Sequence, residues 1–396
     1  MRRYLYILLL GLGALFARPH SAVADPAEWP RALELMAAGQ TEAALPLLEA
    51  LVSATPGNKD YRFELAVALF LLERDFRAKF HLEQVRGAGL TPAEQNMVAQ
   101  FLAQIAARSV WSASFSFALK PESNAGRQTS LNTVTLGGLD FELTPESQAK
   151  PGVSALVTAG IGYSPHINET WRARFSLNTH LRYNKVVSLR DYQLTARAGL
   201  QYLPDPRSSY AFGVHRGSRW VGDARYSSDT GIWGEHVRLA GDRGKWEFVF
   251  DLSAIKYDTT LPDARRQFFL ASYSHALSGS TLLTLTGYAE RMRGTLPSLA
   301  GARTGLTVSG LYAWDGGLMT SLQLGVQSDR RRGVEPLFGL ARKDSTTSLH
   351  LSVYHRDFRI GSFSPTLVMG VEKNRSNIPL ARFDNQFLTL GLTRNF

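Results

Sequence analysis

The chain has 396 residues, of which 44 % are hydrophobic and 20 % are charged, and its formal net charge is +10. This composition excludes a disordered chain, and the 34 glycines follow no Gly-X-Y period, which excludes a collagen. Because the chain has no cysteine, it has no disulfide framework, no thiolate zinc site and no cysteine nucleophile.

The N-terminus has the features of an export signal, which we predict over residues 1–24. A basic start, an apolar run and a small-residue cleavage site follow one another: Arg2 and Arg3, residues 4–16, and Ala22-Val23-Ala24 before Asp25. The apolar run is too short for a membrane anchor. The alternative is an uncleaved N-terminal helix. We expect a mature chain that begins at Asp25 and enters a bacterial periplasm.

Residues 25–108 are predicted to form a periplasmic helical domain, because apolar residues recur at helical spacing between Gly- and Pro-rich breaks. Thr91-Pro92-Ala93-Glu94 predicts a helix start with Thr91 as its N-cap. A shift of 34 residues, the tetratricopeptide period, aligns Ala44 with Ala78 and Leu48 with Leu82. A generic helical bundle is the alternative. Helical repeats of this kind bind extended peptides or protein partners, and the segment carries 11 acidic and 8 basic residues.

From Trp111 onward, apolar and polar residues alternate. Between Trp171 and Tyr183 the odd positions are apolar apart from Thr179, and the even positions are polar. Between Tyr192 and Tyr202 the alternation continues, with the apolar residues at the even positions. Both apolar stripes begin and end in an aromatic ring, which is the girdle pattern of outer-membrane strands. These runs are as long as a tilted strand needs to cross a bilayer. We therefore predict that residues 109–396 form a transmembrane β-barrel.

Fourteen such segments can be counted, and the barrel is predicted to be antiparallel with that number of strands. They start near Trp111, Val153, Trp171, Tyr192, Tyr210, Ser227, Lys245, Gln267, Thr281, Leu306, Leu318, Ser348, Arg359 and Phe383. Every second connection is tight and the alternate ones tend to be longer, as in barrels with short periplasmic turns. An even strand number places both ends of the barrel at the periplasmic side, with the helical domain.

The last strand carries the most specific signal of an outer-membrane barrel. Leu388, Leu390, Leu392 and Phe396 occupy one face of an amphipathic segment that stops on an aromatic residue. Outer-membrane barrels typically end in this way, and the barrel-assembly machinery reads such a strand during biogenesis. An ordinary edge strand that ends on phenylalanine by chance is the alternative.

Enzymatic motifs are missing from the sequence. It contains no G-x-S-x-G elbow, no Walker loop and no H-E-x-x-H motif, and its nine histidines show no ligand spacing. We expect no catalytic residues, no metal site and no cofactor. His215 and the other strand histidines are interpreted as lumen or interface residues.

The positive charge belongs to the barrel. Residues 111–396 contain 33 basic and 23 acidic residues, and four arginines fall on the polar, lumen-side face: Arg172, Arg174, Arg182 and Arg197. They either favour anionic solutes or acidic polypeptide segments, or balance lumenal carboxylates such as Glu247 and Asp251. Arg330-Arg331-Arg332 is predicted in an outside loop, either in contact with lipopolysaccharide phosphates or simply solvated. Nucleic acid is not expected as a partner in this compartment.

Two segments resemble a known family, the surface lipoprotein assembly modulators or Slam proteins. The first is the closing loop Asn374-Arg375-Ser376-Asn377-Ile378-Pro379-Leu380 with the last strand, which is similar to the family's N-R-S-N-I-x-L loop and G-L-x-R-x-F strand. The second is the opening strand with Pro121-Glu122-Ser123-Asn124, although this chain has Asn124-Ala125-Gly126 where the family often has N-x-N.

The resemblance implies a periplasmic tetratricopeptide-like domain, a fourteen-stranded outer-membrane barrel and a role in protein export. Clients of such proteins are surface lipoproteins, including metal- or haem-acquisition receptors, and in some members soluble haem-binding proteins. The helical domain would hold the client, and the lumen or wall of the barrel would be its route. The alternatives are a passive porin or solute channel with a periplasmic docking domain, and a structural or adhesive barrel that docks an envelope partner.

Overall fold

The structure is a computed structural model that describes residues 28–85, 90–108, 110–136, 138–294, 300–355, 358, 360 and 363–395. A group of helices precedes a closed barrel of strands, which confirms the predicted fold class. The predicted export signal, with Ala22, Ala24 and Asp25, lies outside the described residues. None of the helices among the described residues is both long and apolar enough to span a membrane.

The described part of residues 28–108 forms five helices. They are α2 (Glu28–Ala37), α3 (Thr41–Ala54), α4 (Lys59–Leu71), α5 (Asp75–Val85) and α6 (Pro92–Arg108). The helices share one apolar core, in which Ala44, Ala78, Leu48 and Leu82 are fully buried. The small side chains of Ala44 and Ala78 allow the helices to pack closely around this core.

Side-chain caps fix two of the helix starts. Asn58 Oδ1 accepts hydrogen bonds from the backbone N–H groups two and three residues later, at 3.0 and 3.2 Å, and so caps α4. At the start of α6, Glu94 Oε2 accepts from the Thr91 N–H at 2.7 Å, while the Glu94 N–H donates to Thr91 Oγ1 at 3.4 Å. This reciprocal pair is a capping box, and the helix begins at Pro92 as predicted.

Fourteen antiparallel strands make the barrel. They are β1 (Trp111–Glu122), β4 (Gly152–Tyr163), β5 (Trp171–Asn184), β6 (Asp191–Asp205), β7 (Ser208–Val221), β8 (Ala224–Ala240), β9 (Gly244–Tyr257), β10 (Ala264–Ala276), β11 (Thr281–Gly294), β12 (Gly301–Ala313), β13 (Leu318–Glu335), β14 (Leu340–His355), β15 (Ser364–Ser376) and β16 (Phe383–Asn395). Each strand pairs with its neighbours along the chain, and β16 closes on β1. Strands β2 (Thr133–Leu136) and β3 (Leu139–Glu142) form a separate hairpin in the β1–β4 connection.

Most strands start within a few residues of their predicted positions, and the larger differences lie in the last third of the barrel. Strand β12 starts at Gly301 rather than Leu306, and β14 at Leu340 rather than Ser348. Strand β13 runs to Glu335 and includes Arg330-Arg331-Arg332, so the prediction of an outside loop there was wrong. These strand ends are polar on both faces, so they lack the alternation that marks the lipid-facing part.

The alternation of the sequence matches the two faces of the wall. Apolar residues such as Phe175 and Leu177 are exposed on the outer surface, where lipid would cover them. Aromatic rings gather on this surface near the helical end: the Trp111 and Tyr163 ring centroids are 4.4 Å apart, and those of Trp171 and Tyr202 are 4.8 Å apart. They form the predicted girdle of rings at one lipid–water boundary.

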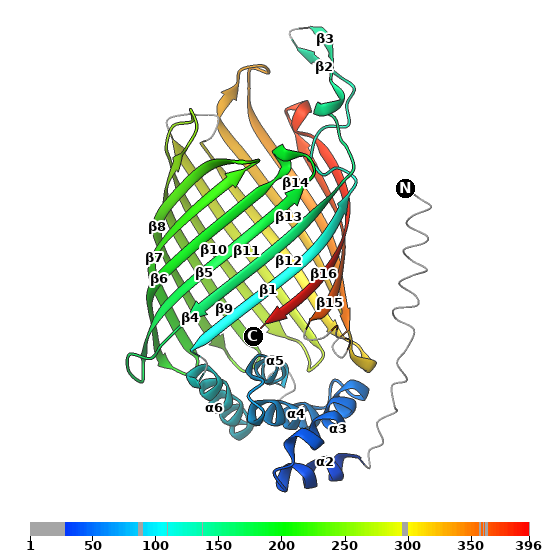
Figure 1. Ribbon diagram of the computed structural model, residues 1–396, viewed down its shortest axis with the longest axis vertical. Helices are drawn as coiled ribbons and strands as arrows, with labels where there is room; N and C mark the ends of the chain where they lie inside the picture. Colours follow the sequence, from blue (N-terminus) through cyan, green and yellow to red (C-terminus); the bar gives the residue numbers. More distant parts are fainter. Residues whose placement is uncertain are drawn as a thin grey trace.

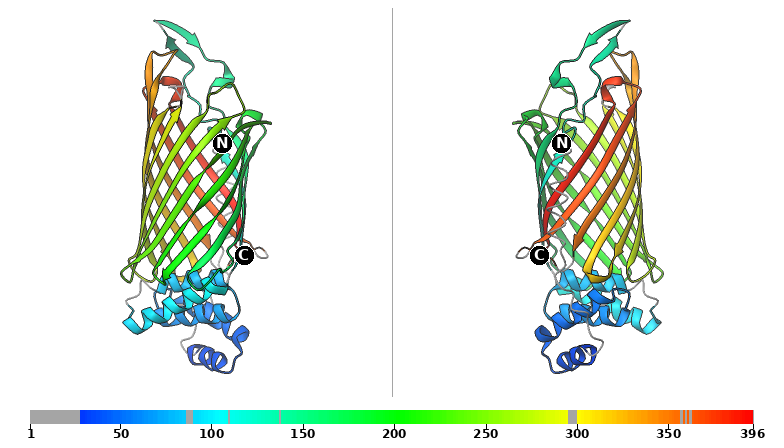
Figure 2. Two further views of the ribbon diagram at one scale, coloured as in Figure 1. Left: turned by 90° about the vertical axis from the view of Figure 1, so that its left-hand side faces the viewer. Right: turned by 90° about the vertical axis from the view of Figure 1, so that its right-hand side faces the viewer.

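The helices lie across one end of the barrel, the end at which β1 starts and β16 finishes (Figure 1). Both side views of Figure 2 show the same arrangement. The tight turns β6–β7, β8–β9 and β10–β11 are at this end, and the β2–β3 hairpin projects from the opposite, distal end. Helix α3 contacts the short helix η4 (Asp315–Gly317) in the β12–β13 turn. Gly57, before α4, lies against Gly279 of the β10–β11 turn.

Candidate functional site

Three of the four arginines predicted on the lumen-side face, Arg174, Arg182 and Arg197, contact a strand that is not their neighbour. Arg174 of β5 has its Nη1 3.1 Å from Glu235 Oε2 of β8. Arg182 Nη2 of β5 lies 2.9 Å from Glu122 Oε2 of β1. Such contacts can form only on the concave side of the wall.

These arginines do not converge on one site. Arg182 lies near the distal end of β5, whereas Arg174 and Arg197 lie nearer the helical end, each with its guanidinium carbon 5.5 Å from the centre of the Trp233 ring. Arg172, at the start of β5, is only 8 % exposed, and its Nε has no hydrogen-bond partner in the described part of the chain. The lumen therefore holds separate basic groups along its length.

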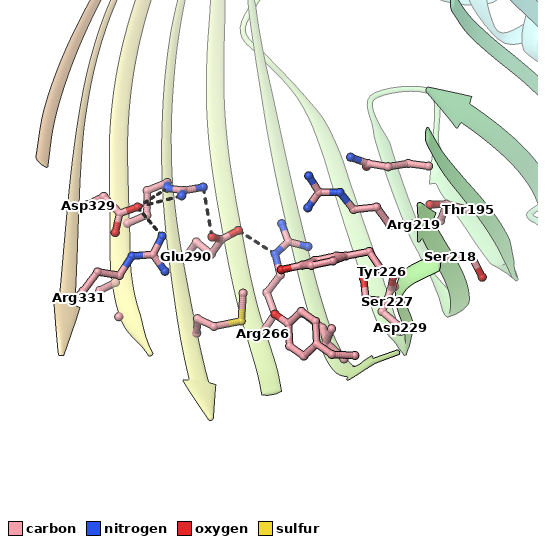
Figure 3. Close-up of a pocket in the computed structure, with 17 residues that line it drawn as sticks. Thr195, Ser218, Arg219, Tyr226, Ser227, Asp229, Arg266, Glu290, Asp329 and Arg331 are labelled. Atoms are coloured by element: carbon pink, nitrogen blue, oxygen red, sulfur yellow. Dashed lines mark hydrogen bonds and ion pairs between the residues drawn. The ribbon is translucent and has the colours of Figure 1, made fainter. Parts of the chain in front are cut away.

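The distal half of the lumen contains a row of interleaved ion pairs beside a cavity of about 330 Å³, and Figure 3 shows this row. Arg266 Nε lies 2.8 Å from Glu290 Oε2, and Arg303 Nη1 lies 3.6 Å from Glu290 Oε1. Asp329 Oδ2 is 2.9 Å from Arg303 Nη2 and 3.2 Å from Arg331 Nη2. The positive groups of this row are balanced by carboxylates.

A polar cluster joins this row to the wall at β7–β9. His215 Nε2 lies 3.1 Å from Asp229 Oδ2, and His215 Nδ1 lies 3.4 Å from Asp251 Oδ2. Ser253 Oγ lies 3.4 Å from His215 Nε2 but donates its proton to Asp251 Oδ1. Because that hydroxyl is engaged with the carboxylate, the cluster is not arranged as a nucleophile with its base. No group of three metal-ligating side chains occurs among the described residues.

The seam between β1 and β16 has a gap in its hydrogen-bonded ladder. Residues 114–119 pair with residues 390–395, and the pairing resumes only at Glu122 and Phe387 in the same register. The Ser123 N–H donates to Gln386 O at 2.8 Å, so odd-numbered residues of β1 direct their N–H groups toward β16. Pro121 has no N–H to donate, and the position opposite it is Leu388.

Side chains brace this seam from inside. Glu122, whose side chain is 1 % exposed, lies 3.1 Å from Lys120 Nζ and accepts a hydrogen bond from Asn385 Nδ2 at 3.2 Å. Asn385 Oδ1 in turn accepts from the Asn124 N–H at 3.1 Å. The first loop is thereby tied to both closing strands. From the sequence, Glu122 stands out only within the opening segment that resembles the family, and Asn385 does not stand out. The proline inside the first strand is the signal that could have drawn attention to this place.

Side-chain hydrogen bonds hold the segment 374–380, which resembles the family's closing loop, to β14 and to the connection before β16. Asn374 is buried, and its Nδ2 donates to Ala381 O at 2.7 Å while its Oδ1 accepts from Thr346 Oγ1 at 2.8 Å. Ser376 Oγ accepts from the Ile378 N–H at 3.0 Å. Asn377 forms two hydrogen bonds with β14. Its Nδ2 donates to Ala341 O at 2.8 Å, and its Oδ1 accepts from the Lys343 N–H at 2.7 Å. Arg375 is exposed near the end of β15, which includes the first three residues of this segment.

The last strand presents its leucines to lipid. Their neighbours Thr389, Gly391 and Thr393 pair with lumen-side positions of β15, so Leu388, Leu390 and Leu392 point outward. Phe396 lies outside the described residues.

Comparison with known proteins gives one family. Residues 111–396 match the family described as surface lipoprotein assembly modifier. A Haemophilus influenzae protein named surface lipoprotein assembly modifier 1 is 23 % identical over 389 residues, covering 93 % of this chain and 77 % of that protein. A Moraxella catarrhalis protein named surface lipoprotein assembly modifier is 22 % identical and covers 93 % of this chain and 72 % of that protein.

Solved barrels are similar at lower identity. The outer membrane channel DcaP of Acinetobacter baumannii has a TM-score of 0.44 and 8 % identity, covering 72 % of this chain and 96 % of that one. A Pseudomonas aeruginosa FadL homologue has a TM-score of 0.42 and 10 % identity, covering 76 % of this chain and 91 % of that one.

Proposed function

Because the chain belongs to the surface lipoprotein assembly modifier family, and its barrel lies in the bacterial outer membrane with its helices in the periplasm, we propose that it moves specific client proteins to the cell surface. The clients are surface lipoproteins or haem- and metal-binding proteins. The helices receive the client in the periplasm, and the barrel is its route. The observation that carries this proposal is the placement of the helices across the periplasmic mouth, which a simple porin does not need.

Two features of the wall support a route that uses both the lumen and the seam. The lumen is lined by ion pairs such as Arg266–Glu290 and Arg303–Asp329, which suit a hydrated polypeptide. A lipid anchor does not suit it, because each CH₂ taken from the bilayer into water costs roughly 0.8 kcal/mol. Pro121 interrupts the ladder between β1 and β16, so this is where we propose that the wall opens for the anchor.

Biogenesis requires a further partner. We propose that the barrel-assembly machinery recognises β16 through its lipid-facing leucines, Leu388, Leu390 and Leu392, before this strand closes on β1.

Surface display of a client tests the function directly. An epitope-tagged candidate client lipoprotein is co-expressed, and intact cells are labelled with an antibody that cannot enter them. We expect display with the full chain and its loss without the chain. Display that is unchanged when the whole gene is removed would refute the translocation proposal.

An engineered disulfide tests the route. The chain has no cysteine, so Ser116→Cys with Thr393→Cys places one pair across the seam, at lumen-side positions that face each other. The control is Ser274→Cys with Thr284→Cys, whose native hydroxyls are 3.0 Å apart across β10–β11. We expect oxidation to reduce display only for the seam pair, and reduction to restore it. Equal display with both pairs oxidised would exclude opening at the seam.

Electrical recording separates the porin alternative. A passive channel would give a large, steady conductance from the full chain in a planar bilayer and no dependence of client display on the chain. Translocation predicts display that depends on the chain and conductance that is small while the helices lie across the mouth.

A further inference from the structure

A basic surface lies on the outside of the barrel, at the distal ends of β10–β14. Glu290 and Asp329 point into the lumen, so the residues next to them along each strand point outward. The outward basic residues, which we call the outer basic patch, are Arg265, Arg291, Arg293, Arg330 and Lys343.

The strand register places like charges opposite each other in this patch. Arg265 of β10 is the direct partner of Arg293 of β11, and Arg330 of β13 is the direct partner of Lys343 of β14. Ala302 of β12 pairs with both Arg291 and Arg330, so a small side chain separates these two arginines. Like charges directly opposite in a sheet are destabilising. The outer face therefore carries a destabilising arrangement of like charges.

The inner face of the same strand ends is different. There, each arginine lies beside a carboxylate. Arg266 Nε is 2.8 Å from Glu290, Arg303 Nη2 is 2.9 Å from Asp329, and Arg342 Nη2 is 2.6 Å from Asp344. Within the described part of the chain, none of the five patch residues forms an ion pair. Charge is balanced inside the barrel and left unbalanced outside, so an anion bound here would relieve the repulsion.

The position of the patch identifies the kind of anion. Toward the middle of these strands, the outward residues are apolar and exposed, among them Phe269, Leu285, Leu306 and Leu324. The patch thus lies directly beyond the lipid-facing band, on the side away from the periplasmic helices. This is the level of the lipid headgroups in the outer leaflet, where lipopolysaccharide carries phosphate groups. Arginine binds phosphate with two parallel hydrogen bonds, which makes these pairs suitable partners for it.

We propose that the outer basic patch binds the phosphate groups of lipopolysaccharide. One phosphorylated headgroup between Arg265 and Arg293, and another between Arg330 and Lys343, replaces repulsion between strands with bridging contacts. The site differs from the one expected in the sequence, since Arg331 points into the lumen and pairs with Asp329 there. It does not depend on the proposed client route.

Binding to the purified full chain in detergent tests this site. The probes are lipopolysaccharide, the same lipopolysaccharide after enzymatic dephosphorylation, and phosphatidylglycerol, and affinity is measured by thermophoresis. The patch variant is Arg265→Gln, Arg293→Gln, Arg330→Gln and Lys343→Gln. The control is Arg238→Gln with Arg243→Gln, two exposed arginines at the helical end of the barrel. A conservative variant carries Arg265→Lys, Arg293→Lys and Arg330→Lys, at the three arginines that the patch variant replaces.

We expect the patch variant to bind lipopolysaccharide at least tenfold more weakly and the control to stay within about threefold of the native chain. The lysine variant, which keeps the charge but loses the paired hydrogen bonds, should fall between the two. Dephosphorylation should weaken binding to the native chain by a similar factor. The heat-dependent mobility of the barrel on a gel checks that each variant is folded. Native affinity in the folded patch variant, or equal affinity for the dephosphorylated form, would overturn the proposal. Equally tight binding of phosphatidylglycerol would overturn the assignment to lipopolysaccharide.

Discussion

Removal of the Glu122 carboxylate should destabilise the barrel more than any other single charge removal at the seam. In Glu122→Ala, Lys120 and Arg182 lose a counter-ion 3.1 and 2.9 Å away, and Asn385 Nδ2 loses its acceptor. The Glu122 side chain is 1 % exposed, so water does not replace these contacts easily. Breaking a buried pair by removing one partner costs about 3–5 kcal/mol, and we expect a loss of this size in the free energy of unfolding.

The assay is reversible urea unfolding of the full chain in lipid vesicles, followed by tryptophan fluorescence. Glu146→Ala is the matched control, because this glutamate lies in the loop at the same end, has a side chain 79 % exposed and is 3.9 Å from Lys150. We expect the control to change stability by less than about 1 kcal/mol. Glu122→Gln, which keeps an acceptor for Asn385, should fall between the two. A loss below about 1 kcal/mol in Glu122→Ala would show that the lumen solvates these cations and would refute the reasoning.

Three further outcomes follow from the helices and the seam. Lys59 and Thr91 lower the pKa of Glu94 from 4.5 to about 2, so thermal unfolding of the helices should lose this stabilisation as pH falls from about 4.5 toward 2, and Glu94→Gln should remove that part of the pH dependence. Leu48→Ala in the core should cost about 2–5 kcal/mol in urea unfolding followed by circular dichroism, against little change for exposed Leu71→Ala. Pro121→Val supplies the missing N–H and should stabilise the barrel by about 0.5–1.5 kcal/mol, measured by the same vesicle assay.

Sequence patterns predicted the wall of the barrel well because lipid imposes a strict alternation on it. Most outward positions between the two headgroup levels are apolar, and so strands such as β5 and β6 begin at or within one residue of their predicted starts. Beyond the headgroups both faces are polar, and nothing in the residue pattern distinguishes a strand from a loop. For this reason the extension of β13 through Arg330-Arg331-Arg332 was not predicted.

The internal network was harder to predict because it depends on closure. Glu122 and Asn385 are separated by nearly the whole barrel sequence and meet only when β16 pairs with β1. Likewise, alternation placed Arg182 inside, but only the register of β1, β4 and β5 could show that Glu122 is its partner. Periodicity gives the direction of a side chain, whereas its partner is set by strand order and stagger.

The short connection between helices and barrel has a consequence for affinity. Helix α6 ends at Arg108 and β1 begins at Trp111, so two residues join them, and a fully extended chain of that length spans only about 7 Å. The end of α6 is also fixed to its own domain, because Arg108 Nη2 donates to Phe70 O at 2.6 Å. Under the proposed function, a client bound to the helices would be presented to the lumen at an effective concentration on the order of millimolar. Weak binding between the client and the helices would then be enough to keep the client at the barrel entrance. Tight binding would only slow its release.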